Sequence, residues 1–175
     1  KFADNGAWHN IGWMLPETVH VFELLGATLD CVDIVASRQC ERIVDLNLPV
    51  DLGDYDVVID AGTTEHCFNI GQALINASNA VRLGGHILHT PPLSMMNHGF
   101  YNLCPTLFHD FYSQNGWQVE IEATLKEEVN KVPPTKRFSA PPECSLLVLA
   151  QRKGLSAMQF PIQTKYIKNP MLKVA

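Results

Sequence analysis

The sequence has few cysteines, and no pattern joins them. Its five cysteines are an odd number and form no Cys-x-x-Cys pair; they are Cys31, Cys40, Cys67, Cys104 and Cys144. Neither a disulfide framework nor a cysteine-based zinc site has this spacing. We therefore expect reduced thiols and a cytoplasmic location.

Positive charge and long apolar runs are also scarce. Lys and Arg number 13 against 18 Asp and Glu, so the formal net charge is −5, and only Lys165–Lys173 is locally basic. This balance argues against extensive nucleic-acid binding, which needs clustered cations to contact phosphates. No apolar run approaches the roughly 20 residues that span a bilayer, and no charged-then-apolar leader opens the chain. We expect a soluble protein without a membrane partner.

The bulk composition is that of a globular protein. The 175 residues are 46% hydrophobic and 18% charged, which suits one domain with its own core. We place this domain at residues 1–152 and treat residues 153–175 as a C-terminal tail. The composition is compatible with a homo-oligomer.

Apolar spacing predicts both helices and strands. Helices are expected from Pro16 to Leu25 with Gly26 as the cap, from Asn69 to Arg82 with Asn69 and Gln72 as cap and capping partner, and from Pro105 to Gly116. Short apolar runs predict strands at 27–35, 42–44, 56–60, 86–90, 117–125 and 144–152. A glycine turn is expected at Arg82–Gly85, and a long polar loop between the last two strands.

The order of these elements predicts the fold class. Strands and helices alternate until the final two strands, which have no helix between them. We therefore expect an α/β fold, a three-layer Rossmann-like doubly wound arrangement with a mostly parallel sheet and a C-terminal antiparallel strand pair.

The stretch from Asp56 to Thr90 resembles the class I methyltransferases. In that family an acidic, apolar fourth strand is followed by a loop that often ends in Glu-His, then a helix, a glycine-containing turn and a fifth strand. The corresponding segments are Asp56–Asp60, Ala61–His66, Asn69–Arg82, Leu83–Gly85 and His86–Thr90. The resemblance extends over residues 16–152, and the block Asn97–Tyr101 with Pro105–Phe108 looks like a subgroup of bacterial and viral members.

The resemblance implies S-adenosylmethionine as the cofactor, bound at the carboxyl ends of the strands. It also implies a glycine-rich loop before Pro16, but Gly6 and Gly12 have the wrong spacing for it. Either this loop lies upstream or in another copy, or the domain has lost cofactor binding.

Several residues are candidates for holding the cofactor. Asp33 would accept the ribose hydroxyls, with Asp30 as the alternative if the strand register differs. Asp45 would accept from the adenine amino group while Leu46 packs on the ring, although Asp33 and Asp45 could equally be solvated or capping acids. The loop after the fourth strand supplies three further candidates, Ala61, Gly62 and Thr63, because glycine allows close backbone approach and a hydroxyl can donate.

Two histidines are candidates for catalysis. His66 and His98 lie in loops expected at the same end of the sheet, and an imidazole can remove a hydroxyl proton near neutral pH. Glu65 is expected to begin the next helix and to interact with its dipole. The polar residues predicted to contact the methyl acceptor are Asn97, Tyr101 and Asn102. The alternative is that they only hold a loop in place.

His86 and His89 are close in sequence but do not predict a metal site. An offset of three residues on a strand points two side chains to opposite faces, so these histidines cannot chelate one ion. We predict no metal site.

The predicted function is methyl transfer from S-adenosylmethionine to a hydroxyl or similar nucleophile of a small-molecule or glycan-like acceptor. The alternative is a non-catalytic methyltransferase-like subunit or a structural or interaction domain. A nicotinamide dehydrogenase is disfavoured, because the chain has no glycine fingerprint and no Tyr-x-x-x-Lys pair.

Overall fold

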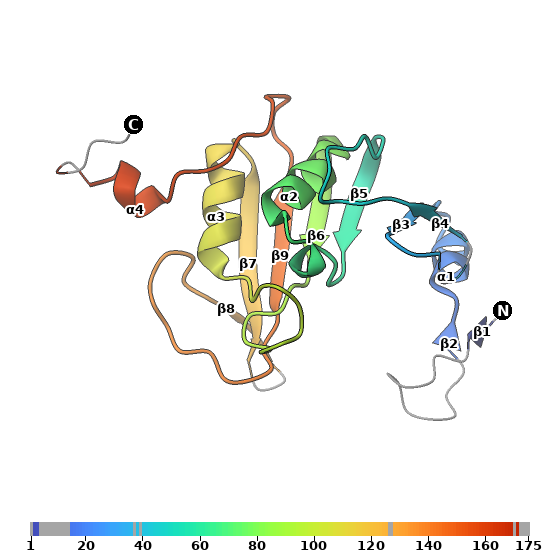
Figure 1. The fold of residues 1–175 in the computed structure, drawn as a ribbon, viewed down its shortest axis with the longest axis horizontal. Helices are drawn as coiled ribbons and strands as arrows, with labels where there is room; N and C mark the ends of the chain where they lie inside the picture. Colours follow the sequence, from blue (N-terminus) through green and yellow to red (C-terminus); the bar gives the residue numbers. More distant parts are fainter. Residues whose placement is uncertain are drawn as a thin grey trace. The chain divides into compact units, whose positions relative to one another are not determined.

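The computed structural model describes residues 2–3, 15–36, 38, 40–125, 128–169 and 171. Contacts divide the chain into two compact units, Lys1–Asp45 and Leu46–Ala175, which are described separately (Figure 1). The domain boundary predicted at residue 152 stays a prediction. Gly6 and Gly12 lie outside the described residues.

The first unit consists of short elements. β1 (Phe2–Ala3) pairs antiparallel with β2 (Leu15–Pro16), and β3 (Cys31–Asp33) pairs parallel with β4 (Glu41–Ile43). Between them α1 (Thr18–Leu24) is followed by Gly26, which has the left-handed φ of +76° predicted for a helix cap. Since α1 has no buried residue, this unit contributes little to a hydrophobic core.

The second unit is built on a five-stranded sheet. Its strands, in spatial order, are β5 (Tyr55–Asp60), β6 (Val81–His89), β9 (Leu146–Gln151), β7 (Gln118–Leu125) and β8 (Glu128–Lys131). The helical segments of this unit are the 3-10 turn η2 (Thr64–His66), α2 (Ile70–Asn79), α3 (Pro105–Gln114) and α4 (Thr164–Ile167). Each helix in the described part of the chain is too short or too polar to span a membrane.

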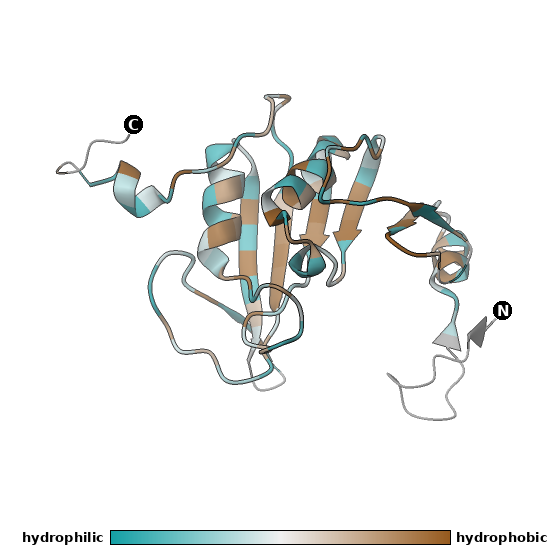
Figure 2. Cartoon of the chain, in the orientation of Figure 1, coloured by the Kyte–Doolittle hydropathy of each residue, from teal (hydrophilic) through white to brown (hydrophobic). Residues whose placement is uncertain are grey.

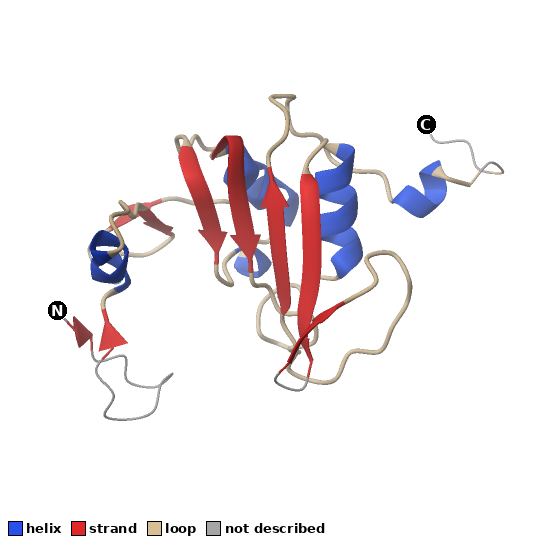
Figure 3. Ribbon diagram, turned by 180° about the vertical axis from the view of Figure 1, so that it is seen from behind, coloured by secondary structure: helices blue, strands red, loops and turns tan. Residues whose placement is uncertain are grey.

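The predicted doubly wound fold is wrong. Only β5 and β6 run parallel in the five-stranded sheet, and the other parallel pair, β3–β4, forms a separate two-stranded sheet. In both ribbon views α2 and α3 cover the same face of the large sheet (Figures 1 and 3). The reason is that no helical crossover separates β7, β8 and β9 in sequence, so β8 and β9 both pair antiparallel with β7. β8 itself lies in the segment predicted as a polar loop.

The core of the second unit lies between the sheet and these two helices. Ile87 and Val148 on the sheet are fully buried and pack in one cluster with Phe108 and Tyr112 of α3. Apolar residues recur along these strands and helices (Figure 2). Because side chains alternate across a strand, the other face of β5 and β9 carries exposed apolar residues, including Val57, which is 53% exposed.

The predicted glycine turn at Arg82–Gly85 lies inside a strand. Tyr55 and Val57 of β5 lie opposite Val81 and His86 of β6, so β6 has several extra residues there. Gly84 takes a left-handed φ of +81°, which suits the residue of a bulge. The strand therefore begins at Val81, five positions before the predicted start at His86.

The capping box predicted for α2 is also absent. Asn69 is the N-cap residue but makes no side-chain capping hydrogen bond. Its amide instead donates to the Asn47 carbonyl over 3.1 Å, and the Gln72 amide donates to Asn76 over 2.8 Å. The contact with Asn47, which is distant in sequence, therefore takes the place of the local cap.

Candidate functional site

A buried hydrogen-bonded chain begins at the carboxyl end of β5. Asp60 accepts from His89 Nδ1 over 2.6 Å, and His89 Nε2 contacts the Tyr112 hydroxyl, also at 2.6 Å. The Thr64 hydroxyl donates to the same Asp60 oxygen over 2.7 Å. All four side chains of this hydrogen-bonded series are buried, so the series ties the loop after β5 to β6 and α3.

These contacts determine the charge state of Asp60. Burial by itself would raise the pKa of its carboxyl, but hydrogen bonds and the adjacent imidazole of His89 outweigh burial and hold the pKa below its ordinary value. The backbone N–H groups of Thr63 and Thr64 add two donors to Asp60 Oδ1, at 3.0 and 3.1 Å. Asp60 is therefore a fully partnered anion.

Glu65, in η2, is the opposite case. Its side chain is completely buried, yet neither carboxylate oxygen has a hydrogen-bond partner among the described residues. Burial raises the pKa of Glu65, and the negative charge of Asp60 adds to the effect, while His66 and His98 oppose it. Glu65 lies in the first turn of a short helix, as predicted, but its complete burial was not predicted.

The two predicted catalytic histidines converge on this carboxylate. His98 Nε2 lies 3.4 Å and His66 Nε2 lies 3.8 Å from Glu65 Oε1, and the two rings are 5.2 Å apart. Their side chains are 41% and 50% exposed, so solvent reaches the imidazoles while the carboxylate lies beneath them. We call Glu65, His66 and His98 the carboxylate–imidazole cluster.

Gly99 is what lets the loop after β6 approach the cluster. A Cβ at this position would lie 2.9 Å from the Glu65 carbonyl oxygen and 3.1 Å from His66 Nδ1. The next residue, Phe100, donates its N–H to that carbonyl over 3.0 Å. The loop therefore packs backbone against backbone beside Glu65, and His98 is held there by its neighbours.

The predicted acceptor-side residues have structural contacts. The Tyr101 hydroxyl donates to the Phe68 carbonyl over 2.8 Å, and Asn102 Oδ1 accepts from the Met95 N–H, also over 2.8 Å. Asn97 is exposed, with a left-handed φ of 63°. Tyr101 and Asn102 thus tie down the loop that carries His98, and an acceptor-binding role for all three stays a prediction.

The predicted cofactor residues fall in both units. Asp33 is the last residue of β3 and lies opposite Ile43 of β4. Asp33 and Asp45 are thus at and just after the carboxyl ends of two adjacent parallel strands. Asp33 Oδ1 accepts from the Val35 N–H over 3.1 Å, while Asp30 lies 3.9 Å from Arg42. Leu46 begins the second unit, where its carbonyl accepts from Asn76.

The other cofactor candidates lie in the loop between β5 and η2. Ala61 and Thr63 are exposed, and Gly62 between them has a left-handed φ of +82°. A Cβ on Gly62 would lie 3.2 Å from Glu65 Oε1. The loop thus brings a polar backbone stretch next to the cluster.

Sequence reasoning missed Glu65 as a buried group and the Asp60–His89–Tyr112 chain. The Glu-His pair at the end of the loop that follows an apolar strand was the available signal for Glu65. No local pattern joins Asp60 to His89 and Tyr112, because their contacts span 29 and 23 residues. His86, as predicted, does not share a face with His89: it is half-buried, whereas His89 is fully buried.

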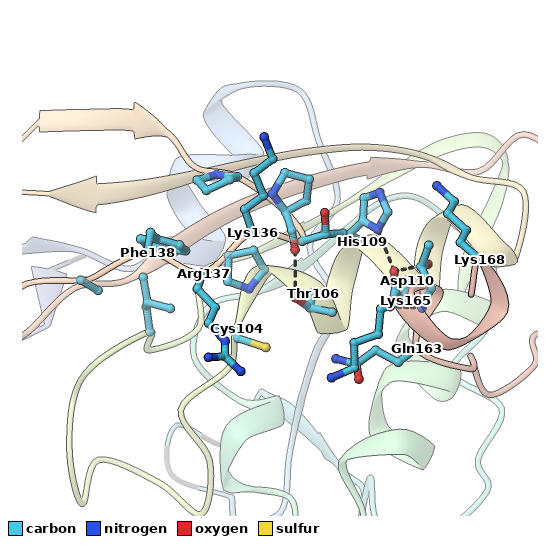
Figure 4. Close-up of a pocket in the computed structure, with 17 residues that line it drawn as sticks. Cys104, Thr106, His109, Asp110, Lys136, Arg137, Phe138, Gln163, Lys165 and Lys168 are labelled. Atoms are coloured by element: carbon cyan, nitrogen blue, oxygen red, sulfur yellow. Dashed lines mark hydrogen bonds and ion pairs between the residues drawn. The ribbon is translucent and has the colours of Figure 1, made fainter. Parts of the chain in front are cut away.

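A separate cavity of about 810 Å³ lies beside α3 and shares no lining residue with the cluster. Figure 4 shows its lining. Asp110 in this lining is hydrogen-bonded to His109 and to Thr164, the first residue of α4. Its cationic side chains are Lys136, Arg137, Lys165 and Lys168. Its positive lining favours an anionic ligand over a metal ion.

Comparison with known proteins assigns no family. No protein-family model matches the chain, and a search of curated proteins finds no match. Function must therefore be argued from the site itself.

Proposed function

We propose that this chain transfers a methyl group from S-adenosylmethionine to a hydroxyl or similar nucleophile of a small-molecule or glycan-like acceptor. The observation that carries the proposal is the carboxylate–imidazole cluster at the carboxyl end of β5. A buried carboxyl group and two solvent-accessible imidazoles meet there, beside Gly62, which has a left-handed φ. The resemblance of this stretch to the class I methyltransferases supports the same activity.

The chemistry needs alignment and one proton acceptor. The acceptor oxygen would form a bond to the methyl carbon while the bond between that carbon and the sulfonium sulfur breaks. The electron pair of the broken bond would stay on sulfur. The hydroxyl proton passes to the cluster, whose imidazoles reach solvent. Positioned proton removal of this kind contributes about 10²–10⁴-fold to a rate, and alignment contributes the larger share.

The acids of the first unit suit the cofactor. Asp33 and Asp45 follow adjacent parallel strands, β3 and β4, and a carboxylate at such a strand end can accept from ribose hydroxyls or an adenine amino group. Asp33 accepts from the Val35 N–H through Oδ1, and we propose that Oδ2 accepts from the ligand. Asp33 and Asp45 would hold the nucleoside of S-adenosylmethionine, which would supply the electrophilic methyl group when bound.

Calorimetric titration of the full chain with S-adenosylmethionine tests this function. We expect saturable binding, and Asp33→Ala should weaken it at least about tenfold, because a hydrogen bond to a charged group is worth about 1.5–3 kcal/mol. Asp54→Ala is the control, since Asp54 is an exposed acid before β5. Absence of binding by the full chain would refute the methyltransferase and favour a non-catalytic subunit; unchanged affinity in Asp33→Ala would refute the ribose assignment.

A further inference from the structure

We propose that Glu65, His66 and His98 form a binding site for a divalent transition-metal ion of the zinc type. The three side chains offer one carboxylate oxygen and two imidazole nitrogens, and these ligand atoms all lie within 4.8 Å of one another. Two histidines with one glutamate are a frequent ligand set for zinc with an open coordination position. The prediction of no metal site considered only His86 and His89.

The unpartnered carboxylate is the first argument. Glu65 is 0% exposed, and both of its oxygens lack hydrogen-bond partners among the described residues. Buried polar groups in folded proteins are nearly always bonded, and an exception calls for a functional explanation or a bound ion. A cation at this point would neutralise the carboxylate and occupy its lone pairs.

The distances are the second argument. A direct hydrogen-bonded ion pair between an imidazolium and a carboxylate would bring nitrogen and oxygen to about 2.8 Å. The observed separations of 3.4 and 3.8 Å from Glu65 Oε1 are longer. Ligands about 2.0–2.1 Å from one tetrahedral zinc ion lie about 3.4 Å from each other. Both Glu65–imidazole separations are therefore close to the distance between two ligands of one zinc ion.

Solvent access to the cluster and the chemical type of its ligands determine which ion it would bind. The imidazoles are exposed by 41% and 50%, so an ion can enter from solvent and retain water at a fourth position. Imidazole nitrogen suits zinc, cobalt and other transition metals, whereas magnesium prefers oxygen ligands. The backbone at Gly99 leaves no room for a side chain beside Glu65 and His66, and it confines the ligands to a small space.

The binding of the ion does not depend on the proposed methyl transfer. Its catalytic consequence does: an ion would occupy the imidazole nitrogens that otherwise accept the proton. It would instead lower the pKa of a hydroxyl at its open position, from which the proton would pass to solvent. Because metal binding is measured without S-adenosylmethionine, failure of one proposal leaves the other standing.

The test is titration of the chelator-treated full chain with Zn²⁺ by calorimetry and with Co²⁺ by visible absorption. We expect one ion per chain at this site, the absorption bands of four- or five-coordinate cobalt, and a higher Tm with Zn²⁺. Mg²⁺ should not compete. Cys31 and Cys40 interact with each other, so a Cys31→Ser/Cys40→Ser variant removes a competing thiol site and should keep the expected signal.

Variants identify the ligands. Glu65→Gln and His98→Asn should each weaken Zn²⁺ binding about a hundredfold or more, since lost outer-shell partners alone cost about 10–100-fold. The controls are Glu120→Gln, an exposed residue of β7, and His20→Asn, a half-buried residue of α1. Glu65→Gln should fold, because a buried amide costs less than a buried carboxylate; circular dichroism checks this.

The outcomes separate clearly. Loss of binding in folded Glu65→Gln and His98→Asn, with both controls unchanged, supports the site. Absence of Zn²⁺ binding by the parent chain, wild-type affinity in either cluster variant, or loss of all binding in the cysteine variant would overturn it.

Discussion

Asp60, at the end of β5, and Glu65, in η2, are buried carboxyl groups close together in sequence, and their surroundings shift their pKa values in opposite directions. Asp60 has four protein donors or partners, and its pKa is lowered; Glu65 has no hydrogen-bond partner among the described residues, and burial raises its pKa. Pairs of titratable groups that are shifted apart in this way are typical of functional sites. At the scale of single residues, Asp60 is a structural anchor and Glu65 is the group with free ligand capacity.

Asp60 should make the folded state sensitive to acid. Its folded pKa is below the ordinary value of 3.8, so its contacts with His89, Thr63 and Thr64 stabilise the fold above that value. This contribution is lost as the pH falls through the lowered folded pKa. Urea unfolding from about pH 6 to about pH 3 should therefore show stability falling below about pH 4.

Asp60→Asn tests the origin of that slope. Removing one partner of a buried charged network should cost about 3–5 kcal/mol near neutral pH, and the stability of the variant should depend less on pH below about pH 4. Asp54→Asn, at an exposed position before β5, should keep the wild-type slope. An unaltered slope in Asp60→Asn would contradict the assignment.

At the scale of elements, the cluster depends on two loops that meet. Residues after β5 supply Glu65 and His66, and the loop after β6 supplies His98, with Phe100 bonded to the Glu65 carbonyl. The parallel pairing of β5 and β6 places both loops at one edge of the sheet. This short parallel pair is therefore enough to assemble the candidate site.

Gly99→Ala should disrupt this meeting of loops. The added Cβ would lie 2.9 Å from the Glu65 carbonyl oxygen and 3.0 Å from Glu65 Cγ, so the loop must shift. We expect a loss of about 1–3 kcal/mol in the free energy of unfolding and weaker Zn²⁺ binding. Gly154→Ala is the control, because no atom lies within 4 Å of its added Cβ; equal effects of the two variants would refute the argument.

The elements differ in how far the sequence predicts them. The helix near Ile70 is recognisable because its apolar spacing matches its burial. The strand near Asp56 is recognisable from its short apolar run, although Val57 and Ile59 within it are exposed. β8 was missed because Val129 is the one apolar residue in Glu128–Lys131, and this strand pairs along a sheet edge, where little apolar burial is required. The start of β6 was missed because its glycines form a bulge inside the strand instead of a turn before it.

At the scale of the whole molecule, stability should be unevenly distributed. The buried hydrophobic residues of the described chain all lie in the second unit, from Leu52 onward, whereas α1 buries no residue. Hydrogen exchange depends on such differences, because weakly packed segments open without global unfolding.

Hydrogen exchange measured by mass spectrometry or NMR should show this division. Amides of β6 and β9 around Ile87 and Val148 should exchange through global unfolding. Amides of α1 should open at a free energy lower by about 3 kcal/mol or more, because a helix this short is marginal without packing. A denaturant series gives the opening free energies, and equal values for the two regions would contradict the prediction.

The sequence by itself determined the local periodicities, the loop Ala61–His66 as a candidate site, and His66 and His98 as candidate residues. These follow from short-range rules of burial and turn formation. Only the tertiary structure decided strand direction, which depends on pairings between distant segments, and it replaced the doubly wound arrangement with a mixed sheet. It alone showed Glu65 buried without partners beneath two imidazoles, because solvent exclusion and contact across 33 residues between Glu65 and His98 are properties of the packed chain.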